Sequence, residues 1–345
     1  MLVAGPPDAV EQRLAIQAGD ERRTAIADVA LVGPAEVGDE IVVNVEAVEL
    51  GLGSGGADIV HVNLTRGLDG LGTPGAHVMK LNYTSLQHAV LPVEEGDAEA
   101  TPVAPQLPLN RPVAVLALHG QLAPLAWAFG RAGTGAGGGG GESGVCDQPR
   151  RLGYVQTAGG ALPGGHSCVV RELREAGLLA GHLTAGPAFG GADGEAITTA
   201  AALHHGLTEL GWDAAVAGPG PGILGSGSAL GHGGLQALDS AHTALALGCE
   251  TVLVARMSST DLRARHRGLS HHTRTVLDLL LAPVCVAIPE GQAPTDERHA
   301  WRVLGADLPG YTASGLPTRS MGREDPLFFA AALASGTALA EKVRA

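Results

Sequence analysis

The sequence predicts an α/β protein: a Rossmann-like, mostly parallel sheet with helices on both faces, preceded by a small N-terminal β-barrel-like domain. Short strand-like alternations separated by glycine clusters fill residues 24–94, and a stretch rich in proline and acidic residues follows at 95–112. From residue 113 onward, apolar runs of strand length alternate with helical stretches, which is typical of strands joined by crossover helices. We therefore expect a β domain at 1–94, a linker at 95–112 and an α/β domain at 113–345.

Residues 24–94 are predicted to form short β-strands, because apolar and polar residues alternate there with a period of two. Glycine clusters such as "GLGSGG" at 51–56 are most simply turns between these strands. A sheet this small needs closure or cover, which favours a small barrel or sandwich. The apolar positions expected on one face are Ile41, Val43, Val45 and Ala47 in one strand, Val60, Val62 and Leu64 in the next, and Met79, Leu81 and Tyr83 in the third.

Several apolar runs in the second half of the chain have the length and composition of buried strands. Helical stretches separate them: 195–211 repeats alanine and leucine at helical spacing, and a later stretch carries Leu235, Leu238, Ala241 and Leu245 along one stripe. The run "GTGAGGGGGES" at 133–143 is predicted to be a flexible surface loop. The expected strands are 113–118, 152–157, 182–186, 214–218, 251–257 and 284–289.

Composition limits the classes of function. The chain has 35 acidic and 22 basic residues and a formal net charge of −13, which argues against nucleic acid as the main partner. Only two of the basic residues, Lys80 and Lys342, are lysines, which disfavours Schiff-base and P-loop chemistry. The opening lacks a signal-peptide pattern and no run reaches the roughly 18 apolar residues that cross a bilayer, so we expect a cytoplasmic protein without a membrane partner. The scattered cysteines are typical of reduced thiols.

Polar residues gather immediately after five consecutive predicted strands. In an open α/β sheet the ligand crevice lies beyond the carboxyl ends of the strands, so a site is expected at these positions. Among them are His119 after the first strand, the loop "GPGPGILGSGS" after the fourth, and Arg256 with Ser258 after the fifth. The sequence therefore predicts a small-molecule site along one edge of the sheet.

The glycine-rich loop after the fourth strand contains a G-x-G-x-x-G pattern. Glycine lets a backbone turn tightly and bring its N–H groups against phosphate oxygens. Because the pattern follows the fourth strand and includes Pro221, in a chain with 52 glycines, a dinucleotide fingerprint, a phosphate or carboxylate cradle and a packing turn all remain open. The residues expected to form a cradle are Gly220, Gly222, Gly225, Ser226 and Gly227.

The stretch "RHRGLSHHT" at 265–273 gathers imidazole and guanidinium groups at the start of a predicted helix. Ser270 is expected to cap this helix, with His271 and His272 in its first turn. Cations there oppose the helix dipole, so either the histidines are neutral or an anion is bound. The nearby arginines favour an anion pocket. Its expected members are Arg256, Ser258, Arg263, Arg267, Ser270 and His272, with His271 placed to transfer a proton.

Two other interpretations of this stretch remain open. Imidazole suits zinc and similar ions, and a ligand set could be drawn from His266, His271, His272 and Asp261, although no H-x-x-x-H spacing supports it. Alternatively, the arginines pair with surface acids and the stretch is a solvated basic helix cap.

Three further features bear on the site or on assembly. His119 could act as a general base, since imidazole titrates near neutrality, or it could be hydrogen-bonded at a strand end. The stretch "GGHSC" at 164–168 offers a nucleophile at Ser167 or Cys168, but the sequence shows no base for it. The apolar tail at 325–343 is expected to pack on the sheet or to form a contact in a homo-oligomer.

Seven stretches support a family resemblance: "GLGSGG" (51–56), "HVMKLNYT" (77–84), "ALHGQ" (117–121), "GGALP" (159–163), "AFGG" (188–191), "GPGILGSG" (220–227) and "RMSSTDLRARHRGLSHHT" (256–273). Together they resemble an uncharacterised bacterial family, the domain of unknown function 3866. The likeness spans most of residues 20–290, whereas Gly120 and the glycine run at 133–143 depart from the family's usual pattern. Because the family has no assigned activity, the resemblance implies no substrate, cofactor or mechanism.

The residues themselves favour a cytoplasmic enzyme that acts on a phosphorylated or other anionic small molecule at the carboxyl edge of the sheet. In this interpretation His271 or His119 transfers the proton. A non-catalytic ligand-sensing or scaffolding protein is one alternative, and a metal-dependent hydrolase that uses the His266 and His271 cluster is another.

Overall fold

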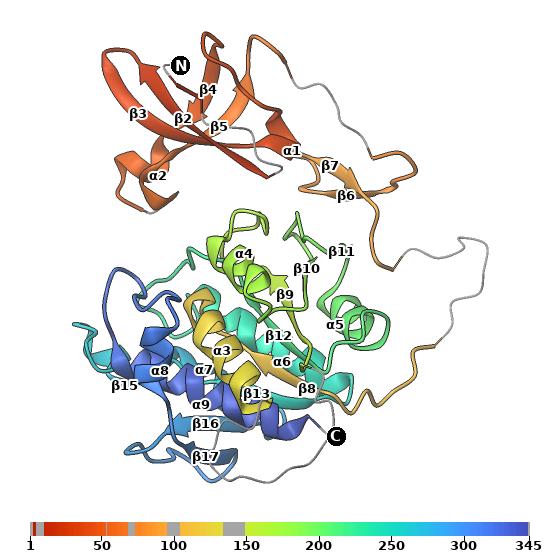
Figure 1. Ribbon diagram of the computed structural model, residues 1–345, viewed down its shortest axis with the longest axis vertical. Helices are drawn as coiled ribbons and strands as arrows, with labels where there is room; N and C mark the ends of the chain where they lie inside the picture. Colours follow the sequence, from red (N-terminus) through yellow and green to blue (C-terminus); the bar gives the residue numbers. More distant parts are fainter. Residues whose placement is uncertain are drawn as a thin grey trace. The chain divides into compact units, whose positions relative to one another are not determined.

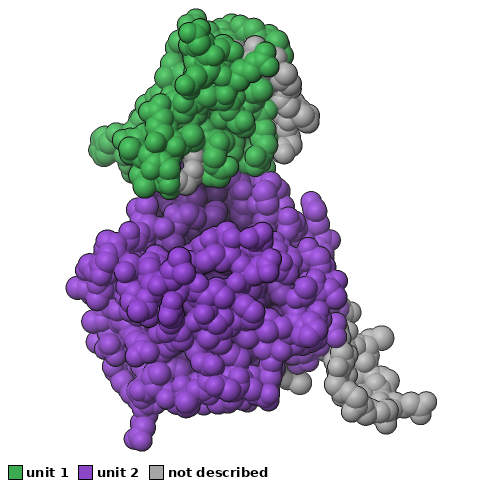
Figure 2. Space-filling view, turned by 90° about the vertical axis from the view of Figure 1, so that its left-hand side faces the viewer, with its two compact units in different colours: residues 1–91 green, residues 92–345 purple. Residues whose placement is uncertain are grey.

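The computed structural model describes residues 3–4, 10–52, 54–67, 73–94, 104–133 and 149–343 (Figure 1). The chain divides into two compact units, residues 1–91 and 92–345, which Figure 2 colours separately. The described end of the expected linker belongs to the second unit, where Leu109 N donates to the carbonyl of Leu247 at 2.9 Å. The rest of that linker and all but the first residue of the expected glycine-rich loop lie outside the described residues.

The first unit is built on a mixed five-stranded sheet of order β1-β2-β3-β5-β4. The long strands β2 and β3 form an antiparallel hairpin, and β3 pairs in parallel with β5. Leu14, Ile16, Ala25 and Val60 form the centre of its apolar core. The elements are β1 (Val3–Ala4), β2 (Glu11–Ala18), β3 (Glu21–Asp28), α1 (Val29–Val32), β4 (Ile41–Asn44), α2 (Glu46–Glu49), the 3-10 helix η1 (Ser54–Gly56), β5 (Asp58–Asn63), and a separate hairpin of β6 (Val78–Lys80) and β7 (His88–Val90).

A small N-terminal β-sheet is confirmed, but two of its expected strands are shorter than the alternation suggests. β4 ends at Asn44, whose side-chain oxygen accepts from Glu46 N at 3.0 Å, and the chain then turns into α2. β6 has only three residues. Met79 is 40% exposed, and Tyr83 is fully exposed with a φ of 61°, a turn conformation.

The second unit contains an eight-stranded sheet of order β11-β10-β9-β12-β8-β13-β16-β17, in which every neighbouring pair is parallel. The Rossmann-like α/β class is therefore confirmed, and the six expected strands correspond to β8, β9, β10, β12, β13 and β16. The strands are β8 (Pro112–Val115), β9 (Leu152–Thr157), β10 (Gly181–Ala185), β11 (Glu195–Ala196), β12 (Ala214–Pro219), β13 (Glu250–Val254), β16 (Cys285–Pro289) and β17 (Ala300–Leu304).

Helices cover both faces of this sheet (Figure 1). The chain leaves the central strand β8 toward β9 and β10 with α3 and α4 on one face, and returns through α5, α6 and α7 on the other, as right-handed crossovers require. The helices are α3 (Leu122–Gly133), α4 (Cys168–Glu175), α5 (Thr199–Thr208), α6 (Gln236–Ala246), α7 (His271–Leu279), α8 (Leu308–Ala313) and α9 (Pro326–Lys342).

The apolar tail packs on the sheet, which was one of the two expectations for residues 325–343. α9 lies against α3, β13 and β16, and nearly all of its apolar side chains are buried. Gly336 permits this close approach, because a Cβ there would collide with the carbonyl oxygen of Leu125. Among the described residues, no helix combines the length and apolarity needed to cross a membrane.

Gln121 holds the centre of the sheet together at its carboxyl end. The ladder between β8 and β13 ends at the pair Val115 and Leu253. Beyond it, the buried amide of Gln121 donates to the carbonyls of Val254 and Ala255 at 3.3 and 3.1 Å, and its oxygen accepts from two backbone N–H groups that follow β8. This side chain replaces the missing ladder bonds and fixes the loops that carry the candidate site.

Candidate functional site

Two groups of buried and half-buried polar side chains lie at the carboxyl edge of the eight-stranded sheet. The arginine-imidazole cluster follows β12 and β13 and consists of Arg256, Asp261, His232, His266, His271 and His272. The Ser-His-Tyr chain belongs to α4, β9 and the segment after β8 and consists of Ser167, His119 and Tyr154. The described contacts of the Ser-His-Tyr chain include no member of the arginine-imidazole cluster.

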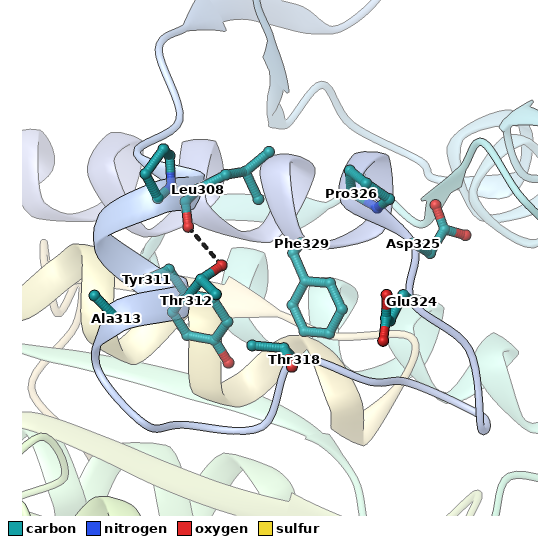
Figure 3. A pocket seen from close by; sticks show the side chains of 10 residues that line it. Leu308, Tyr311, Thr312, Ala313, Thr318, Glu324, Asp325, Pro326 and Phe329 are labelled. Atoms are coloured by element: carbon teal, nitrogen blue, oxygen red, sulfur yellow. Dashed lines mark hydrogen bonds between the residues drawn. The ribbon is translucent and has the colours of Figure 1, made fainter.

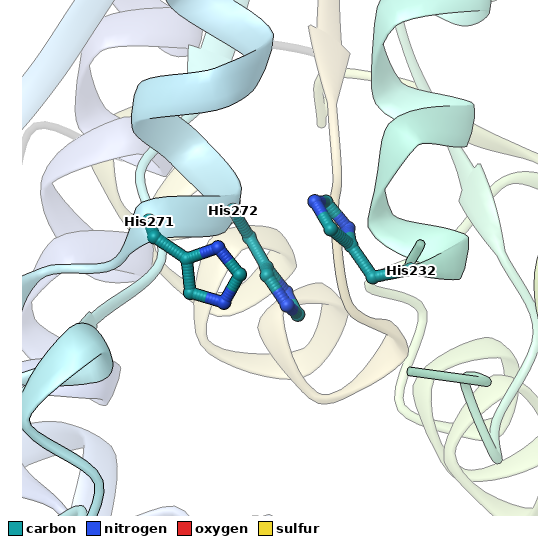
Figure 4. Close-up of side chains that lie close together, drawn as sticks. All are labelled: His232, His271 and His272. Atoms are coloured by element: carbon teal, nitrogen blue, oxygen red, sulfur yellow. The ribbon is translucent and has the colours of Figure 1, made fainter. Parts of the chain in front are cut away.

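Ser270 positions the histidines of α7 as the sequence predicts. Its hydroxyl accepts from His272 N at 3.2 Å, so Ser270 is the N-cap and α7 begins at His271. The same hydroxyl lies 2.7 Å from Nδ1 of His266, at the end of the short helix η4 (Ala264–His266). His271 and His272 project from the first turn of α7, and His232 comes from the segment just before η3 (Gly233–Leu235) (Figure 4).

The four imidazole rings of the cluster pack against one another. His232 and His272 stack with ring centroids 3.7 Å apart and planes 9° apart, and His271 meets His272 edge-on at 4.4 Å (Figure 4). His266 lies 4.8 Å from His271 and 4.9 Å from His272. Four groups that can gain positive charge are therefore held within contact distance, which favours their neutral forms.

Burial and nearby cations lower the pKa of every histidine in the cluster. Burial is the largest cause, and Arg256 adds to it for each ring. The pKa of His266 falls to about 4 and that of His272 to about 2. The pKa values of His232 and His271 are also lowered, although the backbone of Ala229 partly opposes the change for His232. These rings are therefore neutral at pH 7 in the unliganded protein.

Three ring nitrogens of the cluster lack a hydrogen-bond partner. Within the described part of the chain, Nε2 of His271 makes no hydrogen bond, and the ring of His232 has only a contact with the backbone of Ala229 that lacks hydrogen-bond geometry, although all three atoms are buried. An unsatisfied buried donor or acceptor costs about 1–3 kcal/mol, so such groups are uncommon in packed proteins. These nitrogens are positioned to receive polar atoms from outside the chain.

Arg256 brings a buried positive charge to the same place. It is 3% exposed, and its Nη1 donates to Nδ1 of His272 at 2.7 Å. The nearest carboxylate, Asp261, lies 3.8 Å from Nη2 and also pairs with Arg263 at 2.8 Å and Arg323 at 3.0 Å. Burial lowers the pKa of Arg256 to about 10, which still leaves it charged at neutral pH. Because three guanidinium groups share one carboxylate, the cluster retains excess positive charge.

Ser258, Arg263 and Arg267 lie at the cluster but are engaged within the chain. Ser258, in β14 (Met257–Ser258), donates to Asp325 and accepts from Asp261 N at 2.9 Å. Nε of Arg267 donates to the backbone carbonyl of Asp261 at 3.0 Å, and both Arg263 and Arg267 are exposed. These residues fix Asp261, so Arg256 and the histidines are the buried groups nearest the unpaired nitrogens.

The geometry brings together a different metal-ligand set from the one expected. Nitrogen atoms of His232, His271 and His272 lie within 4.8 Å of one another, close enough to hold an ion (Figure 4). Asp261 is instead occupied by guanidinium groups, and His266 by the hydroxyl of Ser270. Since a guanidinium only donates, Nδ1 of His272 is the acceptor for Arg256, and the ring proton must then sit on Nε2. That proton occupies the lone pair a metal would need, so this arrangement suits an anion better than a cation.

Gly220 and Gly222 shape the loop that follows β12. A Cβ at Gly220 would collide with the carbonyl oxygen of Ala161, which packs this loop against the one after β9. Gly222 has a φ of 71°, a conformation that favours glycine. The first two glycines of the pattern therefore have structural reasons to be present.

The second half of that loop is an exposed turn. Gly225 pairs with His232 in an isolated bridge, and the Ser226 hydroxyl donates to the carbonyl of Gly231 at 2.8 Å. Gly227 has open space around it. In a dinucleotide fingerprint the glycines lead directly into a helix N-terminus, whereas here the turn intervenes before η3. The loop nevertheless ends at His232 and so forms one wall of the cluster.

The Ser-His-Tyr chain supplies the base that the sequence did not reveal. Nε2 of His119 lies 2.8 Å from Oγ of Ser167, and Nδ1 lies 3.3 Å from the Tyr154 hydroxyl. Ser167 is also the N-cap of α4 and accepts from Val170 N at 3.2 Å. Tyr154 donates to two carbonyls at the end of β12, at 3.1 and 3.0 Å. Burial lowers the pKa of His119 to about 4 and raises the pKa of Tyr154.

A pocket of 670 Å³ lies between α8 and the start of α9 (Figure 3). Tyr311, Phe329 and Thr318 line it, together with the carboxylates of Glu324 and Asp325 (Figure 3). Asp325 also accepts from Ser258 and Ser259, which lie in the sequence between Arg256 and Asp261 of the arginine-imidazole cluster. The pocket therefore adjoins the cluster through the junction of β14 and α9.

Sequence reasoning missed His232, Tyr154 and Arg323. His232 lies in "GHGG" at the end of the predicted strand-end loop, and a search of such loops for histidine would have found it. Tyr154 lies inside a fully buried strand, where an aromatic residue is normally interpreted as part of the hydrophobic core. Arg323 comes from the segment before α9, and its ion pair with Asp261 spans 62 residues.

The fold and the site define an α/β protein with a parallel sheet, a separate N-terminal β unit and a buried, positively charged cluster at the carboxyl edge of the sheet. The model of one family, described as a protein of unknown function (DUF3866), matches residues 24–336, so the chain belongs to this family. The match spans most of both units and agrees with the resemblance seen in the sequence. Comparisons with curated proteins and with solved structures gave no match.

Proposed function

We propose that the protein is an enzyme that acts on a phosphorylated or other anionic small molecule bound at the arginine-imidazole cluster. The observation that carries this proposal is the set of buried, unpaired nitrogens of His232 and His271 beside the buried charge of Arg256. The formal net charge of −13 disfavours nucleic acid and makes a local excess of positive charge unusual for this chain.

An anion would satisfy the cluster in two ways. Its oxygens would accept hydrogen bonds from the neutral rings of His232 and His271, which no described residue pairs. It would also offset the positive charge of Arg256, which Asp261 shares among three guanidinium groups. Hydrogen bonds to charged groups contribute about 1.5–3 kcal/mol each, so an anion with two or three such contacts would bind measurably.

Proton transfer is the second part of the proposal. A bound anion would raise the lowered pKa of His271 toward neutrality, because it removes part of the charge repulsion from Arg256 and Arg265. A histidine whose pKa rises when substrate binds can take up a proton during the reaction, which suits general acid-base catalysis. A ligand-sensing protein would use the same contacts but leave the ligand unchanged, so product analysis separates the two functions.

A metal-dependent hydrolase is the second candidate, favoured by the close approach of His232, His271 and His272. Ligation through Nε2 of His272 would require the ring proton to move to Nδ1, beside a cation, and Arg256 to give up its bond to that nitrogen. The surrounding positive charge would also oppose a divalent ion. The metal therefore ranks below the anion.

The test measures the melting temperature with added inorganic phosphate or Zn²⁺. Phosphate should raise the melting temperature of the wild type, and Arg256→Gln should weaken phosphate binding by about 10- to 100-fold, the equivalent of one charged hydrogen bond. His271→Gln, a milder change at a partly exposed residue, should also weaken it. Arg302→Gln is the matched control, because Arg302 pairs with Glu341 at the surface.

Two outcomes would contradict the anion proposal. Equal phosphate stabilisation in the wild type and in Arg256→Gln would show that phosphate binds elsewhere. Stabilisation by Zn²⁺ alone, lost in His232→Ala and kept in Arg256→Gln, would replace the anion site by a metal site.

A further inference from the structure

We propose that Ser167 is a nucleophile, activated by His119, that forms a covalent acyl intermediate with an ester substrate. This inference is independent of the arginine-imidazole cluster, because the contacts that carry it are those of the Ser-His-Tyr chain alone. It assigns a reaction type to a second position on the same edge of the sheet.

The hydrogen-bond directions let the hydroxyl of Ser167 donate its proton to His119. Tyr154 has one hydroxyl proton and uses it on the carbonyls that end β12, so its oxygen is free to accept from Nδ1 of His119. With its proton on Nδ1, His119 presents a bare Nε2 to Oγ of Ser167, 2.8 Å away. The serine hydroxyl therefore donates to the imidazole, which is the arrangement that general-base activation needs.

The surroundings keep this histidine neutral and oriented. Burial lowers the pKa of His119 to about 4, so the ring is free to take a proton at neutral pH. Tyr154 stays protonated because burial raises its pKa, and its ring stacks on His182 with planes 9° apart. Tyr154 thus acts as a positioning residue, in the place that a carboxylate occupies in many serine enzymes.

The first turn of α4 offers donors for the oxyanion. Ser167 is the N-cap, and the backbone N–H groups of Cys168 and Val169 have no acceptor within the described part of the chain. N–H groups at a helix N-terminus stabilise developing negative charge. The N–H of the residue directly after a nucleophilic serine often contributes to an oxyanion hole.

The proposed steps balance without a further reactant except water. Oγ of Ser167 bonds to the ester carbon while its proton passes to Nε2 of His119, and the carbonyl electrons move to the oxygen. The carbon–oxygen bond to the alcohol then breaks, and the departing oxygen takes the proton from His119. Water, deprotonated by the same imidazole, later releases the acid and restores Ser167.

A purely structural role accounts for only part of this geometry. A helix N-cap needs an oxygen that accepts from a backbone N–H, and Ser167 already meets that need with Val170. The proton of the same hydroxyl is donated to Nε2 of the buried His119, whose Nδ1 contacts the hydroxyl of Tyr154. Capping requires neither of these contacts.

The test treats the full chain with a fluorophosphonate and, separately, with p-nitrophenyl acetate, and locates any adduct by peptide mass mapping. Oγ of Ser167 should bond to phosphorus with loss of fluoride, or to the acetyl carbon with loss of p-nitrophenolate. We expect one adduct per chain, on Ser167, and none there in Ser167→Ala. His119→Gln should slow labelling by about 100-fold, as the loss of a general base does.

Controls separate reactivity from folding. Ser314→Ala should label at the wild-type rate, because the Ser314 hydroxyl donates to the carbonyl of Tyr311 rather than to an imidazole. Near-ultraviolet circular dichroism should show that His119→Gln and Ser167→Ala keep native packing. The labelling rate should stay constant from about pH 8 down to about pH 6.5, where the protein keeps its full stability, since the pKa of His119 is about 4.

Three outcomes would overturn the proposal: no adduct with either reagent, an adduct at another residue such as Ser270, or labelling of Ser167 at the same rate in a folded His119→Gln variant. Failure of phosphate to bind at the arginine-imidazole cluster would leave this result unaffected, so the two proposals fail separately.

Discussion

Two serine-histidine pairs lie at the carboxyl edge of the sheet, and they share a local design but differ in their surroundings. In each pair the serine is a helix N-cap whose hydroxyl also contacts an imidazole: Ser167 with His119 at 2.8 Å, and Ser270 with His266 at 2.7 Å. The first pair uses Nε2 of the histidine, and the second uses Nδ1.

The surroundings of each imidazole account for the difference. His119 bonds to the neutral Tyr154, whereas the pKa of His266 is lowered by Arg256 and Arg263 as well as by burial. The pair of Ser167 and His119 therefore has a neutral hydrogen-bond partner, which suits a histidine that accepts a proton from serine. The pair of Ser270 and His266 belongs to a positively charged cluster, which suits an anion. The same cap motif supports two different proposals because its electrostatic environment differs.

Acid should disrupt both pairs together, and this is the largest effect we expect. The folded-state pKa is about 4 for His119 and His266, about 3 for His182 and about 2 for His272, against an ordinary value of 6.5. Below pH 6.5 these histidines bind protons in the unfolded chain but stay neutral in the folded chain. The free energy of unfolding is therefore at its full value above pH 6.5 and falls toward pH 4. Each histidine contributes up to about 1.4 kcal/mol per pH unit.

Urea unfolding at several values between about pH 7.5 and about pH 4.5 measures this slope. His119→Gln and His266→Gln should each reduce the slope by roughly the share of one histidine, and similar reductions would show that both rings are buried and neutral. An unfolding free energy that does not change across this range would contradict the burial of these rings.

Removing the shared carboxylate should affect only the charged half of the comparison. Asp261→Asn would leave Arg256, Arg263 and Arg323 without their common anion, at a cost of about 3 kcal/mol in unfolding free energy. Glu341→Gln is the matched control, because Glu341 pairs with Arg302 near the surface and should cost less than about 1 kcal/mol. Equal losses in the two variants would mean that Asp261 is not a buried hub.

How far the sequence predicts this molecule depends on burial. Strands such as β9 and β12 are fully buried on both faces, so their apolar runs are unbroken and their positions were predicted closely. β2 and β3 are half-exposed and carry several charged residues, which hid the two longest strands of the first unit. Ser270 as a cap was predictable because capping depends on neighbours in sequence.

The contacts within the site were less predictable because they join distant parts of the chain. Ser167 and His119 are 48 residues apart and follow different strands, so neither identifies the other in the sequence. Sequence placed His271 and His272 correctly in a first turn, but not the stacking of His232 on His272. Whether two strand-end loops meet is decided by the strand order, which local patterns do not encode.

The smallest expected effect concerns the glycine-rich loop that borders the cluster at His232. Gly220→Ala should destabilise the fold by about 1–3 kcal/mol, because the obstructing carbonyl of Ala161 belongs to the backbone and cannot move aside. Gly227→Ala, with open space around it, should change stability by no more than about 0.5 kcal/mol. Thermal unfolding of the two variants measures the difference, and equal effects would show that the loops after β9 and β12 are not packed together.

The position of α9 in the chain has a consequence for biosynthesis. Arg150, beside the start of β9, donates to the carbonyl of Ala340 in α9 across 190 residues of sequence. At about 5–20 residues per second, a ribosome needs about 10 to 40 s to make the intervening chain. Until α9 is made, the surfaces of α3, β13 and β16 against which it packs lack that cover, so the nascent protein exposes apolar side chains there to chaperones.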